Sequence, residues 1–175
     1  VAGLTFEDVQ VLLKETISST RVGIKVVVTL ERLRTIQIMM LGEVVQPGTY
    51  TVSGLSSLVN TLISTGGIKR SGSLRQIMLK RGSKTIAELD LYDLLLKGDT
   101  SNNTYLRQGD VIFIPPIGET VSVAGEVNRP AIYELKAEET VSDLIALAGG
   151  LLATAAKDKT QIERINYDGS YILLQ

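Results

Sequence analysis

The chain has 175 residues, of which 44% are hydrophobic and 21% charged, enough for one ordinary domain or two small ones. Its 18 basic and 19 acidic residues give a formal net charge of −1, without the basic excess of a dedicated nucleic-acid-binding protein. It contains no Cys, His or Trp, which excludes disulfides, Cys or His zinc sites, cysteine nucleophiles and Ser-His-Asp triads, while a carboxylate-based enzyme or a Ca²⁺ or Mg²⁺ site stays open.

The N-terminal segment, residues 1–34, predicts a helix followed by a strand. Thr5 and Asp8 have the spacing of a capping box, which predicts that a helix begins here. The apolar residues that follow mark one helical face: Phe6, Val9, Leu13 and Ile17. Residues 23–30 are predicted to form a strand. A helix and a strand without partners cannot hold a core, so we expect this segment to be the end of a preceding domain that begins upstream.

Residues 35–52 predict a β-hairpin. Apolar residues occupy alternate positions of the first strand: Ile36, Ile38 and Met40. This period of two is typical of a strand with one buried face. Gly42 lies where that strand would bulge or turn, and Pro47-Gly48 is a turn signal before a second strand at residues 49–52.

The pattern then changes to a helical period. Apolar residues recur at positions i, i+3, i+4, i+7 and i+8: Leu55, Leu58, Val59, Leu62 and Ile63. This spacing predicts a short helix with one apolar stripe. Gly66 lies where a residue of left-handed conformation would end it.

Further strands are predicted at residues 76–80, 84–91 and 111–114, with a short helix at 92–97 closed by Gly98. Gly109-Asp110 forms the turn into the last strand, and Pro115-Pro116 ends it. A hairpin, a crossing helix and further strands describe an α+β fold of the β-grasp type, in which a small mixed sheet surrounds one helix.

The same unit recurs later in the chain at one constant offset. Seven residues are identical at this offset, namely Gly42, Glu43, Val44, Pro47, Tyr50, Gly66 and Gly67, which return as Gly125, Glu126, Val127, Pro130, Tyr133, Gly149 and Gly150. Because these identities share one offset without a gap, we infer two copies of one folding unit. We therefore expect three segments, at residues 1–34, 35–116 and 117–175.

The second copy is predicted to be shorter than the first or truncated. Its helix is predicted to begin with Thr140 as the N-cap and Asp143 at position N3, the spacing of a capping box, and to end at Gly149. Strands are predicted at residues 161–166 and 170–174, with a turn at Asp168-Gly169 between them. The copy lacks the Leu-x-x-Gly-Asp closing strand and has Ala131 where the first copy has Gly48.

These motifs resemble a known family. The pattern combines Leu41-Gly42-Glu43-Val44, Pro47-Gly48-Thr49-Tyr50, Gly66-Gly67 and a closing Leu106, Gly109-Asp110-Val111-Ile112 and Ile114-Pro115. It resembles the SLBB (soluble-ligand-binding β-grasp) domain. The tandem arrangement, preceded by a helix–strand unit, resembles bacterial polysaccharide export proteins of the outer-membrane auxiliary family. In that family residues 1–34 would be the C-terminal part of a polysaccharide-export domain.

The resemblance implies a structural, non-enzymatic component of a capsule or exopolysaccharide export channel. It implies a periplasmic location, associated with the outer membrane in the full-length protein. The implied partners are further copies of the chain in a homo-oligomeric ring, an inner-membrane polysaccharide co-polymerase and the polysaccharide. No cofactor, nucleic acid or membrane span within this segment is expected. The alternative is a soluble periplasmic carbohydrate-binding or adaptor module that does not form a pore.

The repeated motif residues are predicted to be structural. Glu43 and Glu126 could be interpreted as a carboxylate pair for acid–base chemistry. They occupy equivalent positions of separate repeats, however, and nothing brings them to the separation of roughly 5–10 Å that glycosidase chemistry requires. We expect each glutamate to hold the bulge after its strand, with the repeated Gly and Pro residues, Gly109 and Asp110 serving the fold.

Charge is divided unevenly between the repeats. Between Glu43 and Glu88 there is no acidic residue but there are six basic ones: Lys69, Arg70, Arg75, Lys80, Arg81 and Lys84. Residues 35–115 carry 8 basic and 6 acidic residues, a net of +2, and residues 116–175 carry 5 and 9, a net of −4. Three interpretations stay open, namely a solvated face, a subunit interface between unlike charges, and a path for an acidic polysaccharide.

Overall fold

A computed structural model of the chain describes residues 6–20, 27, 34–156, 161–165 and 170–174. The chain divides into two compact units, residues 1–34 and 35–175. In the first unit the predicted helix is confirmed as α1 (Phe6–Thr20), with Glu7 and Asp8 in its first turn, where negative charge is favourable. The predicted cap at Thr5 and almost all of the predicted strand at residues 23–30 lie outside the described residues.

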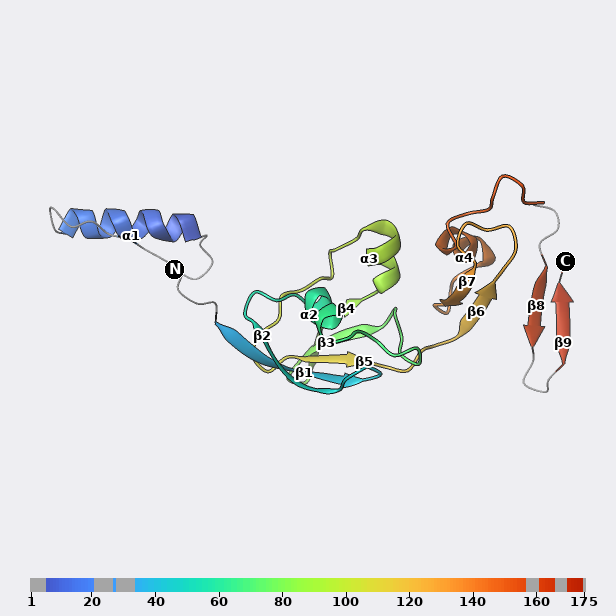
Figure 1. The fold of residues 1–175 in the computed structure, drawn as a ribbon, viewed down its shortest axis with the longest axis horizontal. Coiled ribbons are helices and arrows are strands. Elements are labelled where there is room, and N and C mark those ends of the chain that lie inside the picture. Colours follow the sequence, from blue (N-terminus) through green and yellow to red (C-terminus); the bar gives the residue numbers. More distant parts are fainter. Residues whose placement is uncertain (1–5, 21–26, 28–33, 157–160, 166–169, 175) are drawn as a thin grey trace. The chain divides into compact units, whose positions relative to one another are not determined.

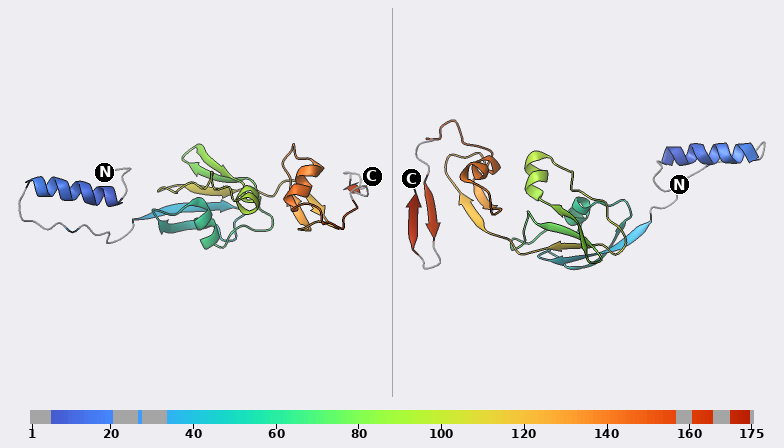
Figure 2. Two further views of the ribbon diagram at one scale, coloured as in Figure 1. Left: turned by 90° about the horizontal axis from the view of Figure 1, so that it is seen from above. Right: turned by 180° about the vertical axis from the view of Figure 1, so that it is seen from behind.

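The second unit begins with a five-stranded mixed sheet. Its elements in chain order are β1 (Thr35–Gly42), β2 (Gly48–Ser53), α2 (Leu58–Ser64), β3 (Ile77–Arg81), β4 (Lys84–Leu89), α3 (Leu91–Lys97) and β5 (Val111–Ile114). The strand order is β2-β1-β5-β3-β4, with β1 and β5 parallel and the other pairs antiparallel (Figure 1). The small mixed sheet predicted for the first repeat is therefore confirmed, and α2 lies against one face of it (Figure 2).

The core of the first repeat lies between this sheet and α2. The alternate residues of β1 are buried as predicted, and Leu58, Leu62, Ile112 and Ile114 pack with them. The predicted stripe on the helix was too wide, because Leu55 is 63% and Ile63 72% exposed. For Leu55 the reason is that the Ser57 hydroxyl accepts a hydrogen bond from the Asn60 amide and starts the helix after Leu55. Ile63 lies within α2 but on its exposed side.

The second repeat contains β6 (Thr120–Val123), β7 (Ala131–Glu134), α4 (Val141–Leu147), β8 (Ile162–Ile165) and β9 (Tyr171–Leu174). The predicted capping box of Thr140 and Asp143 at the start of α4 is confirmed. Among the described residues, however, β6–β7 and β8–β9 are two separate antiparallel hairpins. Within the described residues, the mixed sheet therefore belongs to the first repeat, and no described strand joins the two hairpins of the second.

Candidate functional site

The six basic residues of the first repeat lie in different environments, and Arg75 is the most buried of them. Only 4% of Arg75 is exposed. Its guanidinium donates from Nε to Asp90 at 3.1 Å and from Nη1 and Nη2 to the two carboxylate oxygens of Glu139 at 2.5 and 2.7 Å. Nη1 also donates to the backbone carbonyl of Glu134 at 3.0 Å. Arg75 thus connects the first repeat to the second instead of facing solvent.

Charge is balanced around Arg75 by groups from both repeats. Burial by itself would lower the pKa of Arg75, but the hydrogen bonds to Glu139 and Asp90 outweigh it and hold that pKa above its ordinary value. Burial would likewise raise the pKa of Asp90, but hydrogen bonds from Lys136, the α3 backbone and Arg75 hold it below its ordinary value. The pKa of Glu139 is lowered chiefly by its hydrogen bonds from Arg75. Arg75, Asp90 and Glu139 are therefore charged at neutral pH.

Arg81, the last residue of β3, binds the closing turn of the first repeat. It donates to both carboxylate oxygens of Asp110, each at 2.7 Å, and these hydrogen bonds raise the pKa of Arg81. Asp110 is 0% exposed and also accepts from the Arg107 amide at 2.8 Å. The Gly109-Asp110 motif is therefore held to β3 by an ion pair, which positions the start of β5.

The other four basic residues are less buried than Arg75. The Lys80 ammonium lies 5.0 Å from the centroid of the Phe113 ring, a cation–π distance. Lys69, Arg70 and Lys84 are exposed and have no ion pair within the described part of the chain. These three are the positions of the basic set with a free charge to offer a partner.

The repeated glutamates make the same contact in both repeats. The Glu43 carboxylate accepts a hydrogen bond from the Ser71 hydroxyl at 2.6 Å, and Glu126 accepts one from the Thr154 hydroxyl at 2.5 Å. Ser71 and Thr154 are themselves equivalent positions of the two repeats. Each glutamate ties the end of its first strand to the loop beyond the Gly-Gly pair, which is a structural use of the carboxylate.

Gly42 is required by close backbone contact. Its φ is +84°, and a Cβ atom built there would lie 2.0 Å from the Ile114 carbonyl oxygen. The repeated Gly66 and Gly149 follow α2 and α4 in the left-handed conformation predicted for them, with φ of +96° and +82°.

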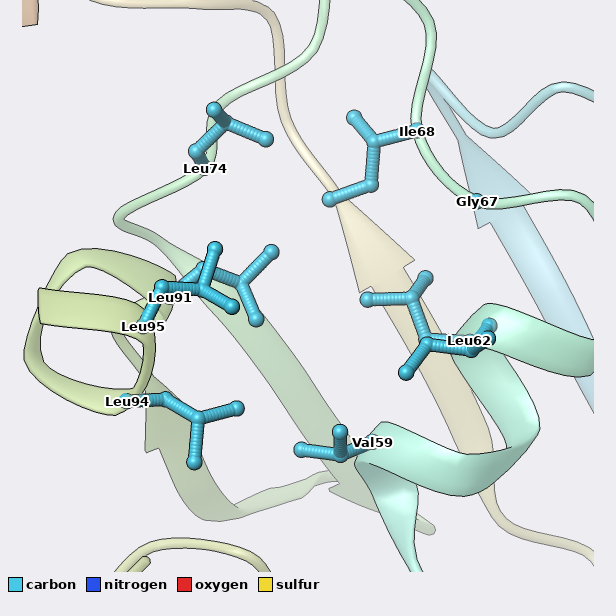
Figure 3. A pocket seen from close by; sticks show the side chains of 9 residues that line it. Val59, Leu62, Gly67, Ile68, Leu74, Leu91, Leu94 and Leu95 are labelled. Atoms are coloured by element: carbon cyan, nitrogen blue, oxygen red, sulfur yellow. The ribbon is translucent and has the colours of Figure 1, made fainter. Parts of the chain in front are cut away.

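A hollow of about 210 Å³ opens between α2 and α3 (Figure 3). Leu62 and Val59 of α2 face Leu94 and Leu95 of α3 across it, and Ile68 lies at one end. The lining side chains are aliphatic, so the hollow lacks the hydrogen-bonding groups that orient a sugar.

Metal-binding clusters and membrane-spanning helices are both absent from the described residues. These residues contain no group of three or more acidic side chains placed to hold a metal ion. None of their helices has the length and apolar character needed to cross a membrane.

The partners of Arg75 were not predicted from the sequence. Asp90, Glu134 and Glu139 are far from Arg75 along the chain, and no local spacing connects them to it. The opposite net charges of the two repeats were the one signal of this junction. The structure shows unlike charges of the two repeats meeting within one chain.

Both repeats match a known family. The SLBB domain family matches residues 37–114 and again residues 120–175. The chain therefore contains two SLBB domains in tandem, as its motifs indicated.

The chain is also similar to named transport proteins. It is 29% identical over 138 residues to polysialic acid transport protein KpsD of Escherichia coli, and 28% identical over 138 residues to a second protein of that name and organism. Each alignment covers 78% of this chain and 25% of the relative, so the chain spans about a quarter of the length of these relatives. The resemblance to polysaccharide export proteins is thereby confirmed as a distant similarity.

Proposed function

We propose that this chain is part of a structural component of a capsule or exopolysaccharide export channel, located in the periplasm at the outer membrane. It acts by forming oligomers through which polysaccharide passes and has no catalytic step of its own. The observation that carries the proposal is the similarity to KpsD, a polysialic acid transport protein, over 138 residues of a chain with tandem SLBB domains. Residues 1–34 are the end of an export domain in this proposal, and an inner-membrane co-polymerase is its partner.

Of the six basic residues of the first repeat, we assign only the three that are unpaired to the proposed contact surface. Arg75 and Arg81 form ion pairs with carboxylates of the same chain, and Lys80 lies over the Phe113 ring. Lys69, Arg70 and Lys84 remain as the free cations of this set. They suit either an acidic face of a neighbouring subunit or an acidic polysaccharide, because exposed complementary charge steers association and sets register.

The test measures the mass of the full-length protein in detergent by light scattering. A mass that is a multiple of the monomer is expected. A strict monomer that binds polysaccharide would instead support the alternative, a carbohydrate-binding or adaptor module, and would remove the channel proposal.

Reversal of charge then separates the two uses of the free cations. A full-length variant carrying Lys69→Glu, Arg70→Glu and Lys84→Glu loses assembly if these residues pack against a neighbour. It assembles but fails in export if they contact polysaccharide, and unchanged assembly and export would contradict both uses. Lys97→Glu is the matched control, because Lys97 is exposed in the same repeat but already paired with Asp93 at 2.6 Å.

A further inference from the structure

The buried core of the second repeat contains a side chain of the first. Tyr92 of α3 is buried among residues of the second repeat, and Leu74 and Leu96 also pack against this cluster: Val127, Tyr133, Leu144, Leu147 and Ala148. The Tyr92 and Tyr133 rings meet edge to face, with their centroids 6.1 Å apart. The core of the first repeat, by contrast, is built entirely from residues between Ile36 and Ile114. The dependence between the two cores therefore runs in one direction.

Glu134, the last residue of β7, is nearly completely buried and makes hydrogen bonds with the first repeat. Glu134 is 3% exposed, and its carboxylate accepts hydrogen bonds from the Leu74 amide of the first repeat at 2.9 Å and from the Gly118 amide of the second at 3.0 Å. Its own amide donates to the Tyr92 hydroxyl at 3.0 Å. A buried carboxylate is tolerated when donors of this kind surround it, so Glu134 requires the first repeat beside it.

Arg75 completes the junction with charges that alternate between the repeats. Arg75 and Asp90 come from the first repeat, and Glu139 and Lys136 from the second. Lys136 donates to Asp90 at 2.6 Å, beside the ion pairs of Arg75. Arg75 and Asp90 are buried members of this set, so removing the charge of Arg75 leaves the buried Asp90 less compensated, and the set favours one docked arrangement over others.

The charged residues that the second repeat contributes to the junction do not recur at the equivalent positions of the first repeat. At the equivalent positions of the first repeat, Glu134, Lys136 and Glu139 are replaced by the uncharged residues Thr51, Ser53 and Ser56. The first repeat forms its hairpin and helix with these uncharged residues, so the repeated unit does not require the charges. Their position at the junction indicates that they serve docking.

We propose that the first repeat is a stable platform and that the second repeat is folded only while docked on it, with Arg75 as the main docking determinant. The platform surface is formed by Leu74, Arg75, Asp90 and Tyr92, and it fits an SLBB repeat with acidic residues at the positions of Glu134 and Glu139. This dependence holds whether or not the full-length protein forms a channel.

Hydrogen–deuterium exchange of the whole chain carrying Arg75→Gln tests the proposal. Amides of β6, β7 and α4 are expected to exchange about tenfold faster or more, because the docked state is selectively weakened, while those of β1, β3 and β5 keep their protection. Unchanged protection in the second repeat would overturn Arg75 as the docking determinant.

Glu139→Gln and Tyr92→Phe keep the test decisive if Arg75→Gln prevents folding altogether. Each removes a single contact of the junction, and each is expected to give the same selective pattern with a smaller increase. A rise of equal size in both repeats would show one cooperative unit and contradict the proposal. Lys97→Gln is the matched control, because it removes the exposed ion pair of Lys97 with Asp93 and no hydrogen bond of the junction, so both repeats are expected to stay protected.

Discussion

The two repeats share a local unit but differ in how that unit is completed. Both have a hairpin, a capped helix, a Gly-Gly pair and a glutamate bonded to a hydroxyl 28 residues later. In the first repeat β5 lies between β1 and β3 and joins two hairpins into one sheet. In the second repeat the two described hairpins stay separate, and the core is completed by side chains of α3 and its neighbourhood.

The repeated motif thus specifies local geometry, whereas the residues that surround the motif differ between the two repeats. Ile112 and Ile114 of β5 are fully buried at the centre of the first repeat. The described core of the second repeat includes Tyr92 of the first. The repeats therefore share the residues of the repeated motif but differ in which other residues complete their cores.

The largest expected loss of stability, and the clearest difference between the repeats, comes from replacing the equivalent glycines Gly42 and Gly125 by alanine. Gly42→Ala places a methyl group against the Ile114 carbonyl of β5 in a left-handed residue, which should cost about 2–5 kcal/mol from strain and overpacking together. Gly125→Ala meets no atom within 4 Å and keeps only the conformational strain, about 1–2 kcal/mol. Urea denaturation followed by circular dichroism measures both.

Equal losses in free energy of unfolding for Gly42→Ala and Gly125→Ala would contradict this difference between the repeats. They would mean that a strand also lies beside Gly125 in solution, at the position that β5 occupies beside Gly42. The measurement thus reports on closure of the second sheet.

The next effect concerns the closing turn of the first repeat. Asp110→Asn removes a carboxylate that accepts from Arg81 and Arg107 while fully buried, and we expect a loss of about 1–3 kcal/mol. Because this turn starts β5, the five-stranded sheet should weaken as a whole. Loss of protection confined to the turn in hydrogen exchange would contradict that view, and Asp99→Asn, an exposed aspartate of the same repeat, is the control.

Much of the first repeat followed from the sequence because its signals are local. Alternation along β1 predicted which residues are buried, and the Thr140–Asp143 spacing predicted the start of α4 in the second repeat in the same way. The helix stripe was overextended at Leu55, because apolar spacing by itself does not show that Ser57 begins the helix.

The junction between the repeats could not be predicted in this way. Arg75 meets Glu139 across 64 residues, and the pairing depends on how two folded repeats dock. The charge difference between the repeats indicated that unlike faces meet, but it did not distinguish a contact within one chain from one between subunits. Propensity and periodicity carry no information on such distances along the chain.

Acid should act on the second repeat before the first. Asp90 and Glu139 have pKa values below the ordinary 3.8 and 4.5, so the stabilisation they give is complete above the ordinary values and is lost as pH falls through the lowered ones. Two-dimensional NMR should show no change between about pH 7 and about pH 5, and selective loss of second-repeat signals below about pH 4. Opening of the second repeat already at about pH 6 would mean that other groups control the junction.

The smallest expected effect is equal in both repeats. Glu43→Gln and Glu126→Gln each weaken an exposed hydrogen bond to a hydroxyl, which should cost at most about 1 kcal/mol. The amides of Lys69 and Leu152 report on it directly, since they donate to the backbone carbonyls of Glu43 and Glu126 at 3.0 and 2.9 Å. Their exchange should accelerate by similar factors, because this contact is local and independent of β5. A markedly larger effect at Leu152 would show that even the shared unit depends on the sheet that completes it.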